Sequence, residues 1–344
     1  MAVEGRVQVG LAGLGRFGKL HAGVLSRLPD AEIVAICDPR SDEVAAVGNA
    51  LGISGRYDSF ASMLEHPGLD CVFIVTPEAT HEELAPLVIE RGLPIFMEKP
   101  LATSAAAGAT VLALAEERGI FLQLGFVLRF EAQHALLKQE LAAGTFGEII
   151  MARVKRNCTR DWIADYGDRA HLVHETTIHD IDLLLWFFQN RCTSVYAVDR
   201  RISGYRNPDA LMAILTFENG AVATLETGWV VPQGAPANTL TDTWHGTIDA
   251  ELEIAGTEQS ARLHILESGL QIWTSSLVKA PDPGLWPEVH GAIAGALRAE
   301  DAHFIECVRT GVPSPVASVT DALEGLRIGE AIIASAASGE VVRL

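Results

Sequence analysis

From Val7 to Phe126 the chain alternates short apolar runs with longer helical stretches. Strands separated by helices are typical of βαβ units, which build a parallel sheet covered by helices. The predicted strands are Val7–Leu11, Glu32–Cys37, Cys71–Val75, Pro94–Met97 and Phe121–Leu124, and the predicted helices are Phe17–Leu28, Glu82–Arg91 and Ser104–Arg118. Gly92 and Gly119 stand where glycines commonly end helices.

The pattern changes after Phe126, where strands begin to follow one another directly. The clearest signal is a hairpin, in which Asn219-Gly220 joins two apolar runs and suits a tight turn. The other predicted elements are helices at Glu131–Ala143, Thr176–Gln189, His290–Arg309 and Val319–Ala337, and strands at Glu148–Arg156, Ala210–Phe217, Ala221–Val231, Ile248–Ile254, Ala261–Leu266 and Leu270–Trp273. We therefore predict an α/β protein with a Rossmann domain over residues 1–125. A substrate-binding and oligomerisation domain of the α+β class, with a large, mainly antiparallel open sheet, is predicted over residues 126–344.

The composition is that of an acidic globular protein. The 344 residues are 49% hydrophobic and 20% charged, and the net charge is −18. That charge argues against nucleic acid or an anionic membrane surface as a partner. The five cysteines are scattered without a CxxC pair, which fits a reducing compartment. Because we see neither a signal-peptide pattern nor an apolar run long enough to span a bilayer, we expect a cytoplasmic protein.

A glycine-rich turn follows the first predicted strand and opens the first helix. Gly13, Gly15 and Gly18 have the spacing that lets a backbone turn tightly and approach a pyrophosphate, with Leu14, Arg16 and Phe17 between them. Asp38 ends the second strand, where a carboxylate can accept hydrogen bonds from an adenosine ribose. The alternative is a plain glycine turn beside a surface aspartate. Asp38 favours NAD as the cofactor, while Arg40 keeps NADP open.

Two further strand ends lie one helix apart, at Thr76-Pro77 and at Glu98-Lys99-Pro100. Neighbouring parallel strands end at the same edge of a sheet, which is where ligands bind in open α/β sheets. Because a residue before proline is restricted to extended backbone, Lys99 is expected to point into a cleft. His81, which begins the helix between them, either lines the nicotinamide side or caps its helix.

Taken together, these motifs resemble the Gfo/Idh/MocA family of nucleotide-dependent oxidoreductases. The resemblance rests on the glycine turn, Thr76-Pro77-x-x-x-His81, Glu98-Lys99-Pro100, Gly125-Phe126 with Arg129-Phe130, the run from Thr177 to Asp182, and the closing stretch from Phe304 to Ser335. It implies a Rossmann domain, an open-sheet domain, and oxidation or reduction of a sugar or polyol carbon. The cofactor contacts would include Thr76, Pro77, His81, Glu98 and Lys99.

Among members of the family the chain is most similar to inositol 2-dehydrogenases. Their catalytic trio of lysine, aspartate and histidine falls on Lys99, Glu175 and His179, so that a glutamate stands where those enzymes carry aspartate. Glu175 and His179 are four residues apart, about 40° on a helical wheel, and can share one face. We predict His179 as the base, Lys99 as the group that stabilises the alkoxide, and Glu175 as the group that orients the imidazole; the lysine and histidine roles could be exchanged.

Several other side chains have two interpretations. Arg129 is assigned to the substrate by resemblance, and Trp162 is either a sugar-facing aromatic or a core residue, as are Tyr166 and Trp229. Asp180 and Asp182 are interpreted as solvent or helix-start charges. The basic run of Arg153, Lys155, Arg156 and Arg160 is either a solvated strand face or a site for an anionic group of the substrate.

A metal site is not predicted, although His171, His174 and His179 lie near Glu175. His174 and His179 are five residues apart, about 140° around a helix, whereas a zinc-binding helix places two histidines four apart.

Three classes of function stay open at this stage. The leading one is an NAD-dependent dehydrogenase acting on a small polyol or sugar. The others are a glycosidase that uses a bound nicotinamide for transient oxidation and a regulator that only binds dinucleotide. An exposed open sheet also predicts a homo-oligomer, a dimer or a tetramer.

Overall fold

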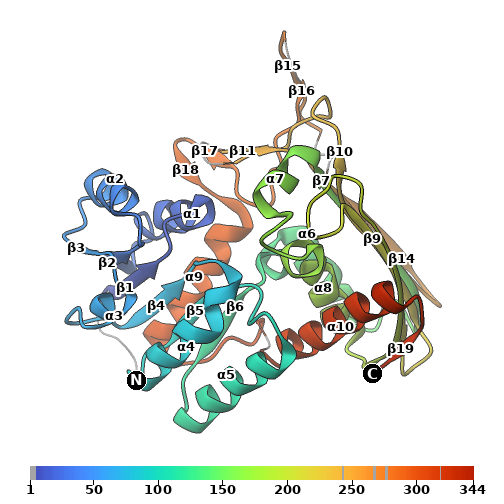
Figure 1. Ribbon diagram of the computed structural model, residues 1–344, viewed down its shortest axis with the longest axis horizontal. Coiled ribbons are helices and arrows are strands. Elements are labelled where there is room, and N and C mark those ends of the chain that lie inside the picture. The colour runs from blue at the N-terminus through green and yellow to red at the C-terminus, as the bar shows by residue number, and fades with distance from the viewer. Residues whose placement is uncertain (1–4, 242–243, 266–268, 276–277, 318) are drawn as a thin grey trace. The chain divides into compact units, whose positions relative to one another are not determined.

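The computed structural model describes residues 5–241, 244–265, 269–275, 278–317 and 319–344. The chain forms two compact units, Met1–Phe130 with Glu288–Leu323, and Glu131–Pro287 with Glu324–Leu344. Both are drawn in Figure 1. Among the described residues, no helix has the length and apolar character that crossing a membrane requires.

The first unit is built on a six-stranded parallel sheet with the order β3-β2-β1-β4-β5-β6. Its strands are β1 (Val7–Ala12), β2 (Ala31–Cys37), β3 (Gly55–Tyr57), β4 (Cys71–Ile74), β5 (Ile95–Glu98) and β6 (Leu122–Gly125). Its helices are α1 (Arg16–Leu25), α2 (Ser41–Leu51), α3 (Phe60–Leu64), α4 (His81–Glu90), α5 (Ala105–Arg118) and α9 (Gly295–Thr310). Every residue of β4, β5 and β6 is buried, as expected for strands with both faces covered. The prediction of a Rossmann sheet is confirmed.

The sequence did not predict the elements between β2 and β4. The short strand β3 lies at the edge of the sheet and contains only three residues, with Gly55 and Arg56 among them, so it lacks the apolar run that marks the other strands. The predicted start of the last helix of this unit was also wrong. His290 and Gly291 both have positive φ values, 53° and 71°, and form a hairpin turn between β17 (Glu288–Val289) and β18 (Ala292–Ile293). Helix α9 therefore begins only at Gly295.

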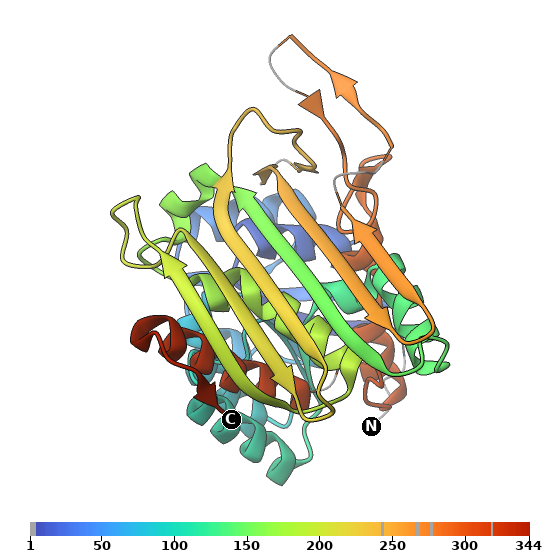
Figure 2. The ribbon, with the colours of Figure 1, turned by 90° about the vertical axis from the view of Figure 1, so that its right-hand side faces the viewer.

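The second unit is built on a seven-stranded mixed sheet with the order β14-β13-β7-β10-β9-β8-β19 (Figure 2). The strands are β7 (Ile149–Thr159), β8 (Cys192–Arg200), β9 (Ala210–Phe217), β10 (Val222–Val231), β13 (Ile248–Gly256), β14 (Ser260–His264) and β19 (Val342–Arg343). The pair β7–β10 is parallel and the other pairs are antiparallel, which confirms a mainly antiparallel sheet. The hairpin at Asn219-Gly220 is confirmed, with Gly220 at φ 87°. The last residue of the predicted strand Ala261–Leu266 lies outside the described residues.

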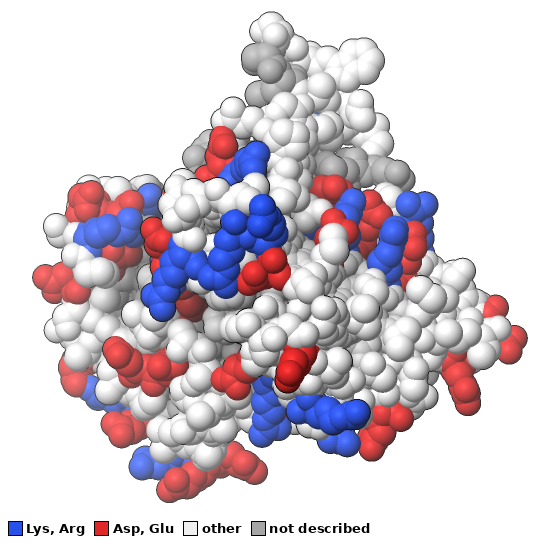
Figure 3. Space-filling view, turned by 45° about the vertical axis from the view of Figure 1, so that its right-hand side comes forward, with Lys and Arg blue, Asp and Glu red and all other residues white. Residues whose placement is uncertain are grey.

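One face of this sheet is packed and the other is open. The main helices of the unit are α6 (Ala132–Ala142), α8 (Ile178–Phe188) and most of α10 (Val319–Ser338), and nearly every residue of α8 is buried. Burial alternates along β9, where Met212 is 56% exposed and Ile214 is 51% exposed while Leu211, Ala213 and Leu215 are buried. Figure 3 shows interleaved basic and acidic side chains beside a wide uncharged area of the surface.

Candidate active site

The glycine-rich turn has the shape that a dinucleotide pyrophosphate requires. Gly13 has φ +91°, and a Cβ atom on it would lie 2.2 Å from the Val75 carbonyl oxygen. A Cβ atom on Gly18 would lie 1.9 Å from the Gly13 carbonyl oxygen, so these two glycines close the turn. Around Gly15 nothing lies within 4 Å of the corresponding position. The middle glycine therefore faces open space at the start of α1, where backbone N–H groups and the helix dipole favour an anion.

Asp38 is fixed at the end of β2 next to this turn. Its Oδ2 accepts a hydrogen bond from the Leu14 backbone N–H at 2.8 Å, and the Arg40 guanidinium binds both carboxylate oxygens at 2.9 and 3.0 Å. Burial alone would raise the pKa of Asp38, but hydrogen bonds from Arg40 and Leu14 outweigh it and lower the pKa. The carboxylate is thus ionised beside the turn, as a ribose-binding group must be, and Arg40 lies against it.

We expect Asp38→Ser to reduce the preference for NAD over NADP by about tenfold or more, since a hydrogen bond to a charged group contributes about 1.5–3 kcal/mol. The change also releases Arg40, which can then meet a 2′-phosphate. The measurement is the ratio of kcat/KM values for the two cofactors. Asp42→Ser, an exposed change in the first turn of α2, is the control. An unchanged ratio in Asp38→Ser would refute the role of this carboxylate.

His81 joins the two loops at the carboxyl edge of the sheet. Its Nδ1 lies 2.7 Å from the Pro100 carbonyl oxygen and its Nε2 lies 3.0 Å from the Thr76 carbonyl oxygen. The ring is fully buried, and burial lowers its pKa although both carbonyls oppose this. Because both ring nitrogens face these carbonyl oxygens, the side chain does not cap α4. It holds the ends of β4 and β5 at a fixed separation, and its contact with the nicotinamide stays a prediction.

Lys99 follows β5 directly, at the carboxyl edge of the parallel sheet, and is partly exposed. Its backbone N–H donates a hydrogen bond to Oε2 of Glu98 at 3.1 Å, and its peptide bond to Pro100 is cis. In the neighbouring strand, Gly125 lies opposite Glu98, and a Cβ atom on Gly125 would come within 2.4 Å of Glu98 Oε1. Because glycine has no side chain, residue 125 leaves room for the Glu98 carboxylate.

Glu175 and His179 lie on one continuous helical segment of the second unit, and both are partly exposed. Residues Val173–Thr177 form a π-helical turn that leads into α8. The predicted helix Thr176–Gln189 thus begins earlier than expected and ends at Phe188, because Gln189 adopts a left-handed conformation. Oε2 of Glu175 lies 3.7 Å from Nη2 of Arg169. Such π turns occur frequently at functional sites.

Asp180 lies in the first turn of α8, which confirms the helix-start interpretation, but it is buried and is not a solvent charge. It is 1% exposed and accepts hydrogen bonds from Arg156 at 2.8 and 3.0 Å, so that the pair fastens α8 to β7 directly beside His179. Asp182 is also buried.

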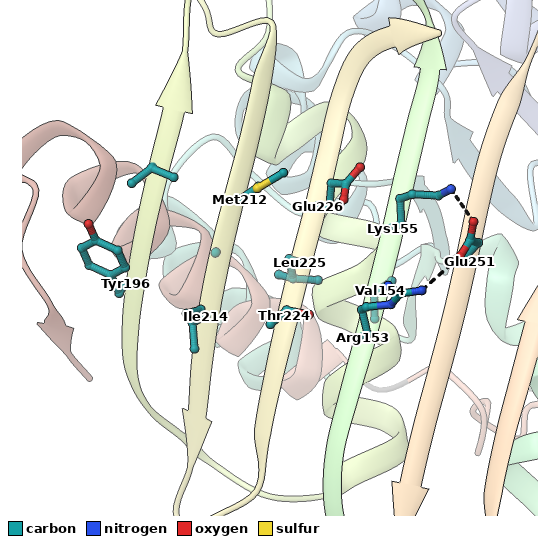
Figure 4. A pocket seen from close by; sticks show the side chains of 12 residues that line it. Arg153, Val154, Lys155, Tyr196, Met212, Ile214, Thr224, Leu225, Glu226 and Glu251 are labelled. Carbon is teal, nitrogen blue, oxygen red and sulfur yellow. Dashed lines mark hydrogen bonds and ion pairs between the residues drawn. The ribbon is translucent and has the colours of Figure 1, made fainter.

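On the other face of β7, Arg153 and Lys155 pair with Glu251 of β13 (Figure 4). The basic residues of β7 are therefore divided between the two faces of the sheet. Carboxylates pair with the charges of Arg153, Lys155 and Arg156.

Two side chains assigned to the substrate have partners within their own units. Arg129 is buried and donates hydrogen bonds to the Val316 carbonyl oxygen and to Asp321, at 2.8 and 2.9 Å. Trp162 is buried, donates to the His245 carbonyl oxygen at 3.0 Å, and packs against Trp244. Their substrate contacts stay predictions. Across the described part of the chain, no group of three or more His, Cys, Asp or Glu side chains is arranged to hold a metal ion.

The sequence did not reveal two buried residues near Glu98, the residue before Lys99. His21 of α1 contacts Asp301 of α9 through one ring nitrogen and Glu98 through the other. The only local signal is the position of His21 on the helix that the glycine turn opens, since Asp301 lies 280 residues further on.

Comparison with known proteins identifies the family of the chain. The family described as "Oxidoreductase family, NAD-binding Rossmann fold" matches residues 7–126, and the "GFO/IDH/MocA C-terminal domain" matches residues 134–262. The chain is 29% identical to scyllo-inositol 2-dehydrogenase (NAD(+)) of Bacillus subtilis, over 99% of this chain and 97% of that protein. It is 30% identical to inositol 2-dehydrogenase of Rubrobacter xylanophilus over 67% of each chain.

The fold is similar to that of a solved structure, apo scyllo-inositol dehydrogenase from Lactobacillus casei. The TM-score is 0.85, the identity is 22%, and the match covers 99% of each chain. Because both family models match and the Rubrobacter relative is 30% identical over 67% of each chain, the chain belongs to the Gfo/Idh/MocA family and is an NAD-dependent oxidoreductase.

Proposed function

We propose that this protein oxidises a secondary alcohol of a cyclic polyol or sugar, with scyllo-inositol as the first substrate to test. The observation that carries the proposal is the similarity to scyllo-inositol 2-dehydrogenase over nearly the whole of both chains. The lysine of the Glu-Lys-Pro motif and the carboxylate–histidine pair support it, because these are the groups that removal of a hydroxyl proton requires.

In the proposed mechanism, side chains of this protein bind the alcohol and remove its hydroxyl proton. His179 removes the hydroxyl proton, and the ammonium group of Lys99 stabilises the negative charge that develops on the oxygen. Glu175 orients the imidazole of His179. Bound NAD supplies the hydride acceptor. The lysine and histidine roles can be exchanged without changing the residues required.

A substrate screen tests the proposal and separates it from the two rivals. The purified protein is incubated with NAD and with inositols, pentoses, hexoses, anhydrosugars and glycosides, while NADH absorbance and product formation are followed. A dehydrogenase forms NADH in proportion to oxidised product. Cleavage of a glycoside without net NADH would identify the glycosidase, and binding of NADH with no turnover of any compound would favour the regulator.

We also propose that the open face of the second sheet joins two copies of this chain. Exposed apolar side chains on this face, Tyr196, Val198, Met212 and Ile214, adjoin Arg153, Lys155 and Glu251 around a shallow hollow of about 550 Å³. Figure 4 shows the charged residues at one side of it and the apolar ones at the other. Because both signs of charge occur in one patch, a second copy related by a two-fold axis can complement it.

We expect the double variant Met212→Glu, Ile214→Glu to form a smaller assembly than the parent protein does, because each change places a charge in the proposed contact. Size-exclusion chromatography with light scattering measures the mass. The control is Leu136→Glu, because Leu136 is a similarly exposed apolar residue, 60% exposed, on α6 rather than on the sheet. A parent protein that is monomeric, or a double variant with the parent's mass, would contradict this interface.

A further inference from the structure

Three ionisable side chains from distant parts of the first unit meet beneath the carboxyl end of β5. Nδ1 of His21 lies 2.9 Å from Oδ1 of Asp301, and Nε2 of His21 lies 3.2 Å from Oε1 of Glu98. His21 and Asp301 are fully buried and Glu98 is 6% exposed. We refer to His21, Glu98 and Asp301 as the buried triad.

The two carboxyl groups of the buried triad favour the charged form of its imidazole. Burial alone would lower the pKa of His21, but the charges and hydrogen bonds of Asp301 and Glu98 outweigh burial and raise the pKa to about 10. Burial also raises the pKa of Asp301, although His21 opposes this, and each ring nitrogen faces one carboxyl oxygen at hydrogen-bond distance. Burying charged groups opposes folding, and well-packed apolar side chains often serve stability as well as a buried ion pair does.

Apolar contacts already hold α9 in place without the buried triad. The ring of Phe304, on α9, lies 5.2 Å from that of Phe73, 5.7 Å from that of Phe96 and 5.6 Å from that of Phe121. Aromatic packing thus attaches α9 to the sheet without the buried triad. The buried triad adds contacts of defined direction between α9, α1 and the end of β5.

Glu98 connects the buried triad to Lys99. One oxygen of the Glu98 carboxylate faces His21, and the other accepts the backbone N–H of Lys99 at 3.1 Å. The absence of a side chain at Gly125 leaves the carboxylate close to the backbone of β6. The carboxylate is therefore held from two sides and binds the peptide N–H of the residue that follows it.

We propose that the buried triad positions Lys99: Asp301 holds His21, His21 holds Glu98, and Glu98 fixes the backbone from which the ammonium group reaches the alcohol. The inference rests on the proposed function, in which Lys99 contacts the reacting alcohol. The three members are positioning residues. A helix far along the chain from the glycine turn would in this way control the geometry of the reacting lysine.

Asp301→Asn tests the proposal, because it preserves the shape of the side chain and removes its charge. We expect kcat for the polyol to fall about 10- to 100-fold, as for a reacting group displaced by a fraction of an ångström to 1 Å, while the Kd for NADH changes less than about threefold. The pH profile of kcat is expected to shift as well.

A second measurement does not depend on activity. The rate of acylation of Lys99 by acetic anhydride is followed by mass spectrometry as a function of pH, with Lys138 of the second unit as the internal reference. We expect the pH midpoint for Lys99 to shift in Asp301→Asn and that for Lys138 to stay the same.

Glu131→Gln is the matched control, since Glu131 forms another buried carboxylate–histidine pair, 2.7 Å from Nδ1 of His134, in the second unit. It is expected to lower stability without changing the acylation of Lys99. If Asp301→Asn does not fold, the double variant His21→Leu, Asp301→Ala removes both charges together and is expected to show the same loss of kcat.

Parent-like acylation and a parent-like pH profile of kcat in the variants, with only lower stability, would overturn the inference. A shifted acylation midpoint in a protein that oxidises no alcohol would uphold the positioning of Lys99 and refute the proposed function instead.

Discussion

Replacing Lys99 by alanine is expected to lower kcat for the polyol by about 100-fold or more, because general acid–base groups typically contribute about 10²- to 10⁴-fold. The ammonium group is the positive charge assigned to the developing alkoxide, and its loss affects the transition state more than the ground state. Steady-state kinetics with saturating NAD gives kcat, and fluorescence titration with NADH shows whether the cofactor still binds.

The matched control is Lys279→Ala, which removes an ammonium group from β16 (Val278–Lys279) of the second unit. It is expected to retain the activity of the parent. Lys99→Ala with activity within a few fold of the parent would remove this lysine from the mechanism, and loss of NADH binding would show that its main role is to hold the cofactor.

Replacing Arg156 by leucine is expected to lower the free energy of unfolding by about 3–5 kcal/mol, because removing one partner of a buried pair leaves an unpaired charge. Arg156 and Asp180 are both buried, and Asp180 follows His179 on α8. The change should therefore also lower kcat. Urea unfolding followed by circular dichroism measures the stability.

Arg153→Leu is the control, since it breaks exposed ion pairs on the open face of the same strand and is expected to cost at most about 1 kcal/mol. The double variant Arg156→Leu, Asp180→Leu should recover most of the lost stability. Equal losses for Arg153→Leu and Arg156→Leu would contradict the assignment of Arg156 to the core.

The parts of the fold that local sequence determines could be predicted. Strong apolar runs marked β1, β2, β4, β5 and β6, and the glycine turn and Asp38 follow from the spacing along one βαβ unit. Successive residues of β7 point to opposite faces of the sheet, so Arg153 and Lys155 share one face and Arg156 lies on the other. That alternation separates the exposed basic residues from the buried one.

Features that depend on distant contacts could not be predicted. Asp301 meets His21 only because α9 returns to the first unit after six of the seven strands of the second sheet, all but β19. The helix start at Gly295 depends on two consecutive residues with positive φ, one of which, His290, gives no sequence signal for it. The π turn that contains Glu175 likewise has no periodicity that distinguishes it from an ordinary helix.

The most direct test of the central claim is to follow the hydrogen atom that leaves the alcohol. Scyllo-inositol, or the best alcohol from the screen, is deuterated at its carbinol carbon and incubated with the protein and NAD. We predict that deuterium appears in NADH in proportion to the ketone formed and that the Lys99→Ala variant transfers it at a far lower rate. Deuterium that never reaches free NADH, with any alcohol tested, would contradict the assignment of this protein as a polyol dehydrogenase.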